Sequence, residues 1–245
     1  MDTLVFVHGY LGGSPQWAPQ VAEFSKRFRV ITPDLPGFGL NRAMTAPESI
    51  DGFARFVLDD LERQGVDRFH LVGHSMGGMI VQQMVALAPD RVDRLVLYGT
   101  GPIGLMPGRF EPIDESRRKL NEDGVERTAC RIAATWFLHG EDGSGYSTCA
   151  ELAIRASLQA ALAGLKAMES WSGVANLSSV ASPTLVLWGD GDRAYQWSQV
   201  EQLWRQIADA GLAVVPGCSH AVHLEKTALF NALLMDFLVP QSPGH

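Results

Sequence analysis

Short apolar runs recur along the chain and alternate with longer amphipathic segments. Most of the runs are apolar at consecutive positions, which is typical of parallel strands covered on both faces. Between two of them, Asp51–Glu62 repeats apolar residues at i, i+3, i+4 and i+8, as one face of a helix does. We therefore expect an α/β fold with a mostly parallel sheet of about six strands and helices on both faces. The predicted strands are Thr3–Val7, Arg29–Thr32, Phe69–Val72, Arg94–Tyr98, Pro183–Trp188 and Leu212–Val215.

The alternation stops between Gly101 and Ala181. This stretch opens with a loop rich in Gly and Pro and continues with helical periods, without a convincing strand. The simplest interpretation is a helical cap inserted after the fourth predicted strand. We expect one core built from residues 1–100 and 182–245, with the cap formed by residues 101–181.

Composition narrows the classes of protein that fit. The 245 residues include 20 Lys and Arg against 27 Asp and Glu, a net charge of −7, which disfavours a nucleic-acid partner. Three cysteines cannot form a disulfide framework and fit a reducing compartment. No apolar run is long enough to span a membrane, and the first residues lack the features of a signal peptide. We expect a cytoplasmic protein with no membrane partner, and nothing in the pattern predicts its oligomeric state.

The strongest local motif is Gly73-His74-Ser75-Met76-Gly77-Gly78, between a predicted strand and an apolar helical segment. It matches G-x-S-x-G, the nucleophile elbow. The turn is so tight that neighbours of the serine must be glycine, because a Cβ there would clash. It lifts the hydroxyl above the sheet edge, beside the free N–H groups of a helix N-terminus. The pattern alone is common, but its position between strand and helix predicts Ser75 as a nucleophile.

A serine nucleophile needs a base, and the chain has seven histidines. We expect the base at His220, in the loop after the last predicted strand, because loops at the carboxyl ends of parallel strands carry the chemistry of such sheets. His223 is the nearest rival, although it lies at the start of the predicted final helix, Leu224–Leu238. The other five have structural interpretations. His8 stabilises a turn, His70 lies in a strand, His74 belongs to the elbow, His139 lies in the cap, and His245 is terminal.

The base in turn needs a carboxylate to orient it. Asp192 follows the fifth predicted strand, with Asp190 as its competitor, and both could instead be turn residues. The loop after the fourth strand, 98–101, offers no carboxylate, which favours Asp192. The order Ser75, Asp192, His220 is the nucleophile, acid and base order known for this arrangement.

A glycine-rich turn directly follows the first predicted strand. The segment His8-Gly9-Tyr10-Leu11-Gly12-Gly13 can aim a backbone N–H at the point that the Met76 N–H also reaches. Two such donors form an oxyanion hole, and one donor typically lowers the barrier by about 3–4 kcal/mol. We expect Tyr10 and Met76 to supply them.

Together these motifs resemble the α/β-hydrolase superfamily over almost the whole chain. The resemblance implies the same catalytic residues, a structural role for Asp34, and no external cofactor. Two features depart from the family pattern: Ser219 stands where glycine usually precedes the histidine, and the usual N-terminal hairpin is missing. The segments that carry the resemblance are His8-Gly9 with Trp17, Asp34–Gly39, Gly73–Gly78, Pro183–Asp192 and His220–Glu225.

The predicted cap is similar to those of enol-lactonases and small carboxylesterases. Its apolar side chains, with one from the first loop, predict a mostly apolar pocket. The pocket candidates are Leu11, Leu105, Met106, Trp136 and Phe137. No basic cluster in the cap predicts a strongly anionic acyl group, although single arginines could bind one, with Arg131 the first candidate. These arginines are Arg109, Arg117, Arg118, Arg127 and Arg131.

Ser-His-Asp chemistry implies acyl transfer through an acyl-enzyme. The leading hypothesis is hydrolysis of a small, largely apolar carboxylic ester or lactone. Alternatives are a hydrolase or lyase acting on a carbon–carbon bond with the same triad, and a ligand receptor with little turnover. Cys218, His220 and His223 match no zinc spacing, so we expect no metal.

Overall fold

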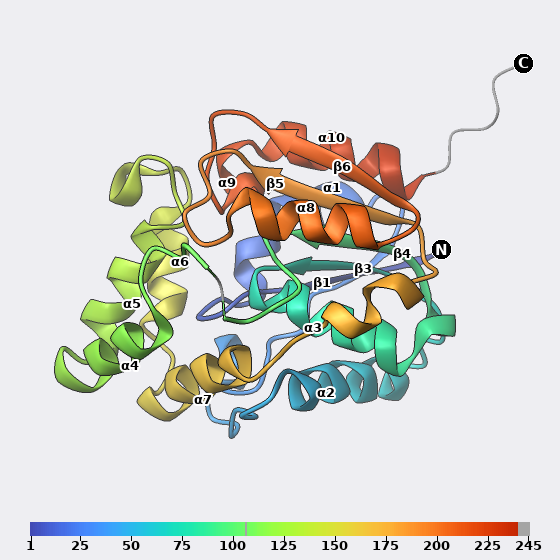
Figure 1. Ribbon diagram of the computed structural model, residues 1–245. Coiled ribbons are helices and arrows are strands. Elements are labelled where there is room, and N and C mark those ends of the chain that lie inside the picture. The colour runs from blue at the N-terminus through green and yellow to red at the C-terminus, as the bar shows by residue number, and fades with distance from the viewer. Residues whose placement is uncertain (106, 240–245) are drawn as a thin grey trace, which may run out of the picture.

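The computed structural model describes residues 1–105 and 107–239, and its centre is one six-stranded sheet (Figure 1). The strand order is β2-β1-β3-β4-β5-β6, and every neighbouring pair is parallel. This confirms the predicted fold class. The strands are β1 (Thr3–Val7), β2 (Arg29–Ile31), β3 (Phe69–His74), β4 (Val92–Tyr98), β5 (Thr184–Gly189) and β6 (Ala210–Val215).

The predicted strands differ from the observed ones only at their ends. Strand β3 continues two residues further than predicted, because His74 still pairs with Tyr98 of β4. Strand β5 begins at Thr184 and not at Pro183, since proline has no N–H for the sheet. Strand β6 begins two residues earlier, at Ala210, which pairs with Thr184.

Alternate side chains of each strand enter separate apolar cores on the two faces of the sheet. In β1, Leu4 and Phe6 join the core formed with α1 and α10, whereas Val5 and Val7 join the core beneath α2, α3 and α8. All four side chains are fully buried, which explains the continuous apolar pattern. The helices of the sheet layers are α1 (Ala18–Phe24), α2 (Ile50–Arg63), α3 (Met76–Leu87), α8 (Trp197–Gln206), α9 (Val222–Glu225) and α10 (Thr227–Leu238).

The final helix differs from the single segment predicted over 224–238. Lys226, with φ −132° and ψ 47°, separates α9 from α10. The backbone hydrogen-bond ladder is interrupted there, and α9 becomes part of the loop that carries His220.

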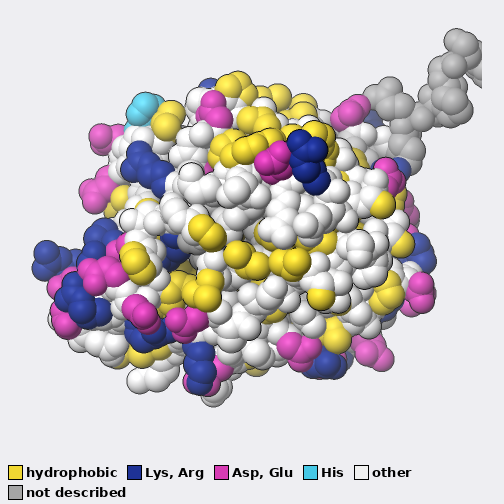
Figure 2. All heavy atoms as spheres, in the orientation of Figure 1, with side chains coloured by type: hydrophobic (Ala, Val, Ile, Leu, Met, Phe, Trp, Pro, Cys, Tyr) yellow, Lys and Arg dark blue, Asp and Glu magenta, His cyan; other side chains and the backbone are white. Residues whose placement is uncertain are grey.

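Between β4 and β5 the chain forms four helices, which we call the cap helices: α4 (Ile113–Glu122), α5 (Val125–Ala134), α6 (Tyr146–Ala153) and α7 (Leu158–Glu169). They lie at one side of the sheet, at the left of Figure 1. The only pairing in this stretch that resembles a strand, among the described residues, is an isolated bridge between Ile103 and Ser172. Figure 2 shows side chains of both charge signs gathered over this end of the molecule.

Short 3-10 helices complete the connections, at Ser14–Trp17, Gly39–Asn41, Pro89–Arg91, Gly140–Asp142 and Val174–Ser179. Within the described ranges, none of the helices combines the length and the apolar character that crossing a membrane requires.

Candidate active site

Ser75 lies at a sharply strained turn between β3 and α3. Its backbone has φ 58° and ψ −121°, a conformation that costs a non-glycine residue free energy and recurs at functional sites. Its N–H donates to the Tyr98 carbonyl oxygen at 3.0 Å, which extends the pairing of β3 with β4. A Cβ on Gly77 would lie 2.2 Å from the Val7 carbonyl oxygen, and one on Gly73 would lie 2.5 Å from the Gly77 carbonyl oxygen. The turn is therefore possible only because both residues lack a side chain.

The loop after β1 approaches Ser75 closely. A Cβ on Gly9 would lie 2.9 Å from Ser75 Cβ, and Leu11 is, with Ser75, one of the two non-glycine residues with positive φ in the described chain. His8 fixes the loop: its Nδ1 donates to the Gly9 carbonyl oxygen at 2.8 Å, and its Nε2 accepts from Leu35 N at 3.0 Å. The Tyr10 hydroxyl donates to the Ala161 carbonyl oxygen in α7 at 2.9 Å. This loop is therefore attached to both the sheet and the cap helices.

Met76 is the first residue of α3, so its N–H has no acceptor one turn earlier in the helix. It stands directly after Ser75, whose Cβ the loop of Gly9 approaches closely. The two predicted oxyanion donors thus belong to segments that meet at Ser75, and their role is a proposal that we develop below.

His220 and Asp192 form a buried pair at the carboxyl end of the sheet. His220 Nδ1 lies 2.8 Å from Asp192 Oδ2, and the side chains are 1% and 0% exposed. The other carboxylate oxygen accepts from the N–H groups of Ala194 at 2.7 Å and Tyr195 at 3.1 Å. These bonds hold the carboxylate as an orienting group and leave Nε2 of the imidazole for the chemistry.

Two neighbouring side chains position the backbone of His220. Its carbonyl oxygen accepts from His74 Nε2 at 3.1 Å and from the Tyr98 hydroxyl at 2.7 Å. The elbow histidine and the last residue of β4 therefore fix the position of His220, although no sequence pattern pointed to either for this purpose. Gly99 completes the arrangement, because a Cβ there would lie 3.1 Å from His220 Nδ1.

Ser219, the departure from the family pattern, has a structural function in the same loop. Its hydroxyl donates to the Gly191 carbonyl oxygen at 3.0 Å, which joins the loop of the histidine to the loop of Asp192. Its N–H donates to Glu225 Oε2 at 2.7 Å, and Glu225 Oε1 accepts from Leu138 N at 2.7 Å. The serine therefore adds a bond between two site loops.

The competing candidates lie elsewhere. Asp190 accepts from Gly217 N at 2.8 Å and is exposed, so it stabilises a turn. The His223 ring is buried and packs 4.6 Å from the Trp17 ring, with its Nδ1 3.0 Å from the Tyr98 hydroxyl. His223 is therefore a core residue in α9. Burial lowers its pKa from 6.5 to about 3, so it stays neutral at ordinary pH.

A small cavity of about 20 Å³ lies beside Ser75. Most of its walls are apolar or aromatic, and the polar side chains of Ser75, Arg109 and His220 interrupt them. The residues that line it are Tyr10, Ser75, Arg109, Phe110, Ile132, Trp136, Met168, Ala194, Tyr195 and His220. Nucleophile and base candidates therefore share one space under the cap helices. Its volume is close to that of a single water site, so the cap helices lie close over the serine.

Of the five predicted pocket residues, the cavity includes Trp136 alone. Leu11 and Phe137 are fully buried and belong to the core, because apolar side chains of this size pack against the helices behind the wall. Leu105 is 59% exposed and lines a different pocket on the surface. Met106 lies outside the described residues. The prediction of a pocket built on these side chains is thus wrong for Leu11, Phe137 and Leu105.

Tyr195 is a residue that the sequence analysis missed. Its ring stacks on His220 with 5.7 Å between ring centroids and an interplanar angle of 14°. The hydroxyl is buried and has no hydrogen bond of normal geometry within the described chain. Burial raises the pKa of this phenol, and the nearby Ser75 hydroxyl partly opposes the rise. Tyr195 therefore adds a protonated phenol to the cavity lining, near the Ser75 and Thr100 hydroxyls, and no motif indicates it beforehand.

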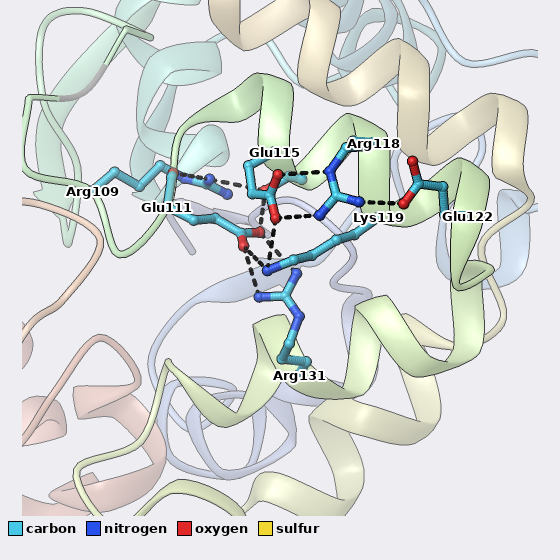
Figure 3. A network of polar contacts seen from close by, with 8 residues as sticks. Arg109, Glu111, Glu115, Arg118, Lys119, Glu122 and Arg131 are labelled. Atoms are coloured by element: carbon cyan, nitrogen blue, oxygen red, sulfur yellow. Dashed lines mark hydrogen bonds and ion pairs between the residues drawn. The ribbon is translucent and has the colours of Figure 1, made fainter.

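Several basic residues of the cap helices form ion pairs with nearby glutamates (Figure 3). Arg131, the first candidate for an anion, bonds both oxygens of Glu111, at 2.9 and 2.8 Å, so it is already occupied. Arg118 pairs with Glu115 and Glu122. Arg109 is the one of the five predicted arginines that lines the cavity.

The chain is similar to known proteins over almost its whole length. Residues 2–227 match the family described as alpha/beta hydrolase fold. A 2-hydroxy-6-oxononadienedioate/2-hydroxy-6-oxononatrienedioate hydrolase of Paraburkholderia phymatum is 31% identical over 256 residues, which cover 97% of this chain and 87% of that protein. An (E)-2-((N-methylformamido)methylene)succinate hydrolase of Acinetobacter baylyi is 26% identical over 251 residues, with 97% and 90% covered. The solved enol-lactonase from Burkholderia xenovorans LB400 has a TM-score of 0.87 at 24% identity, with 97% and 92% covered, a likeness of fold.

Proposed function

Because this chain belongs to the α/β-hydrolase family, we propose that it is a serine hydrolase that cleaves a small, largely apolar carboxylic ester or lactone. One observation carries the proposal: the buried His220–Asp192 pair, 2.8 Å apart, opens into the same cavity as the strained Ser75. Nucleophile, base and orienting acid are the set that acyl transfer requires.

In the proposed reaction, His220 Nε2 takes the proton of the Ser75 hydroxyl while the serine oxygen attacks the substrate carbonyl carbon. Asp192 holds the imidazole by its Nδ1–H and stabilises the imidazolium that forms. The carbonyl oxygen becomes an oxyanion, which the N–H groups of Tyr10 and Met76 bind. His220 then donates its proton to the departing alcohol oxygen, and an acyl-enzyme remains on Ser75.

Deacylation uses the same groups with water in place of the alcohol. His220 removes a proton from water, the hydroxide attacks the acyl carbon, and Ser75 leaves with the proton returned by the imidazole. The cap helices cover this site, and the side chains of Ile132, Trp136 and Met168 supply an apolar wall. Such a wall favours a hydrocarbon acyl or alcohol portion next to the ester.

A second candidate is cleavage of a carbon–carbon bond with the same triad. It is favoured by the 31% identity to the Paraburkholderia phymatum hydrolase, whose name denotes a hydroxy-oxo acid and not an ester. A keto acid offers a carbon–carbon bond next to a carbonyl, which Ser75 could attack as it would an ester. The two candidates share every residue of the mechanism and differ in the leaving group, carbon or oxygen.

The test is hydrolysis of p-nitrophenyl acetate and of short and medium methyl esters, together with fluorophosphonate labelling. Wild-type protein should hydrolyse the esters and bind the label at Ser75, and Ser75→Ala should lose both. His220→Ala should slow labelling, because the imidazole activates the serine. Labelling without ester hydrolysis, together with turnover of a 2-hydroxy-6-oxo dienoate, would favour the carbon–carbon bond candidate. Labelling at full rate in His220→Ala would contradict the assigned base.

A further inference from the structure

Arg109 is a cation placed at the boundary between the inside and the outside of the site. It lines the small cavity that contains Ser75 and His220, and it also lines a surface pocket of about 360 Å³. Its guanidinium packs 4.2 Å from the centre of the Phe110 ring, which lies in the same cavity wall. A ligand that reaches the serine from the surface pocket therefore meets this side chain.

No carboxylate within the described residues forms an ion pair with Arg109. Its Nη1 donates to the Glu111 carbonyl oxygen at 2.7 Å and to the Ser116 hydroxyl at 3.0 Å, both uncharged acceptors. The Glu111 carboxylate is turned toward Lys119, at 3.0 Å, and Arg131 (Figure 3). Two cations thus already neutralise the one buried carboxylate nearby, and Arg109 adds an uncompensated positive charge.

The acidic residues of the outer pocket do not supply the missing partner. Glu111 is held by Lys119 and Arg131, while Asp114 and Glu169 both pair with Arg117. Burial lowers the pKa of Arg109, with Glu111 opposing that effect, so the guanidinium is a partly desolvated cation. A desolvated cation gains more from an anion than an exposed one does, because water competes less.

Tyr195 is a second polar group in the same cavity, with its hydroxyl near those of Ser75 and Thr100. Its side chain is 1% exposed, and its hydroxyl has no hydrogen bond of normal geometry within the described chain. A buried hydroxyl of this kind costs free energy until an acceptor binds it. The cavity therefore combines a guanidinium and a phenolic donor, and a carboxylate accepts hydrogen bonds from both kinds of group.

We propose that Arg109 and Tyr195 form a carboxylate-binding subsite, so that the substrate carries a free carboxylate in addition to the bond that Ser75 attacks. This inference rests on the proposed function, which specifies the bond that is attacked, and it further specifies that the substrate is an anion. Arg109 is the specificity-determining residue, since its planar group can bind both carboxylate oxygens. Tyr195 adds one hydrogen bond and lies next to both Ser75 and His220.

The experiment compares pairs of esters that differ in charge and little in shape. One pair has the carboxylate on the acyl side, monomethyl glutarate against methyl 4-carbamoylbutanoate, and the other on the alcohol side, O-acetylglycolate against O-acetylglycolamide. Wild-type protein should show a kcat/KM at least about 30-fold higher for the anion in one pair, as expected for a buried charge pair. Arg109→Gln should bring that ratio close to one, and Tyr195→Phe should lower it several-fold through KM.

Arg127→Gln is the matched control, since Arg127 is an exposed arginine in a cap helix and does not line the cavity. It should leave the ratio unchanged. Arg109→Lys keeps the charge without the planar fork and should give an intermediate ratio, which covers the case in which the glutamine variant fails to fold. A wild-type ratio of one or less in both pairs, or a full ratio in Arg109→Gln, would overturn the subsite.

A binding measurement separates this inference from the proposed function. Ser75→Ala protein is titrated calorimetrically with monomethyl glutarate and with its neutral amide analogue, neither of which it should cleave. Preferential binding of the anion, lost when Arg109→Gln is added, supports the subsite even if wild-type protein hydrolyses no ester. Equal binding of both compounds, while the esters are hydrolysed, contradicts the subsite and leaves the hydrolase proposal standing.

Discussion

The site has two halves that are built on different principles. The core half, with the elbow, the loop of Gly9 and the His220–Asp192 pair, is defined by backbone contacts: added Cβ atoms at its glycines would overlap carbonyl oxygens. The cap half is defined by side chains, above all by Glu111 and the cations around it. Steric contacts of the backbone allow a single conformation of the core half. In the cap half, by contrast, a carboxylate can form its ion pair with any of several cations. Chemistry is therefore expected from the rigid half and substrate choice from the adaptable half.

The largest effect should come from the carboxylate of the core half. Asp192→Asn keeps the shape but offers an NH₂ where His220 donates, so the imidazole loses its orientation and kcat should fall about 10⁴-fold. Ester hydrolysis at saturating substrate measures it. Asp190→Asn is the control, because Asp190 bonds only the exposed Gly217 turn, and its kcat should stay within a few-fold of wild type. Equal losses in the two variants would contradict the assigned acid.

The buried histidines of the core half should make stability depend on pH. Burial lowers the pKa of His8, His74 and His223, the last to about 3, so each binds a proton less readily in the fold than in the unfolded chain, whose histidines titrate near pH 6.5. Stability should be nearly constant above about pH 7.5 and fall between pH 6.5 and 5.5, by up to about 1 kcal/mol per histidine. Urea unfolding at the two pH values measures it.

Two histidine variants test that origin. His223→Gln removes one buried imidazole and should reduce the loss of stability between pH 6.5 and 5.5. His139→Gln changes an exposed histidine of the cap and should leave the loss unchanged. An unchanged loss in His223→Gln would assign the pH dependence to other groups.

The elbow glycine should be next in size. A Cβ on Gly77 would lie 2.2 Å from the Val7 carbonyl oxygen, so Gly77→Ala forces β1 and α3 apart and should lower the free energy of unfolding by about 3 kcal/mol. Gly211→Ala in β6 is the control, since its nearest neighbour would be 3.9 Å away, and it should change stability by less than about 1 kcal/mol. Chemical denaturation of both variants measures their free energies of unfolding. A Gly77→Ala variant as stable as Gly211→Ala would show that β1 and α3 can move apart without cost.

The smallest effects should come from the charges of the cap. Glu111 is 8% exposed and its partners are partly exposed, so Glu111→Gln should cost about 1–2 kcal/mol. Arg118→Gln removes two exposed ion pairs and should cost less than about 1 kcal/mol, decreasing with salt. Denaturation at low and high salt compares them. Equal costs would show that burial does not distinguish these ion pairs.

The contrast also explains what the sequence could predict. Continuous apolar runs predicted all six strands. In β1 and β3 every residue is buried, and burial on both faces requires such runs, whereas the edge strands β2 and β6 are partly exposed. Ser75 could be singled out because its glycines leave a fixed spacing in the chain. Arg109 could not, since the sequence favoured Arg131 among five arginines until the fold placed Glu111 against Arg131 and left Arg109 without an ion pair to a carboxylate. No motif marks Tyr195, and only the fold places its ring against His220 and its hydroxyl in the cavity lining.

The hydrogen bond from the Tyr10 hydroxyl to the Ala161 carbonyl oxygen has a consequence for the timing of catalysis. It joins the loop proposed to bind the oxyanion to α7, so the position of one depends on the position of the other. Such coupling is reciprocal: a transition-state analogue that orders the loop should stabilise the position of α7 by the same free energy. A displacement of α7 would in turn move the loop proposed to bind the oxyanion, so that motion of the cap helices and the chemical step would be linked.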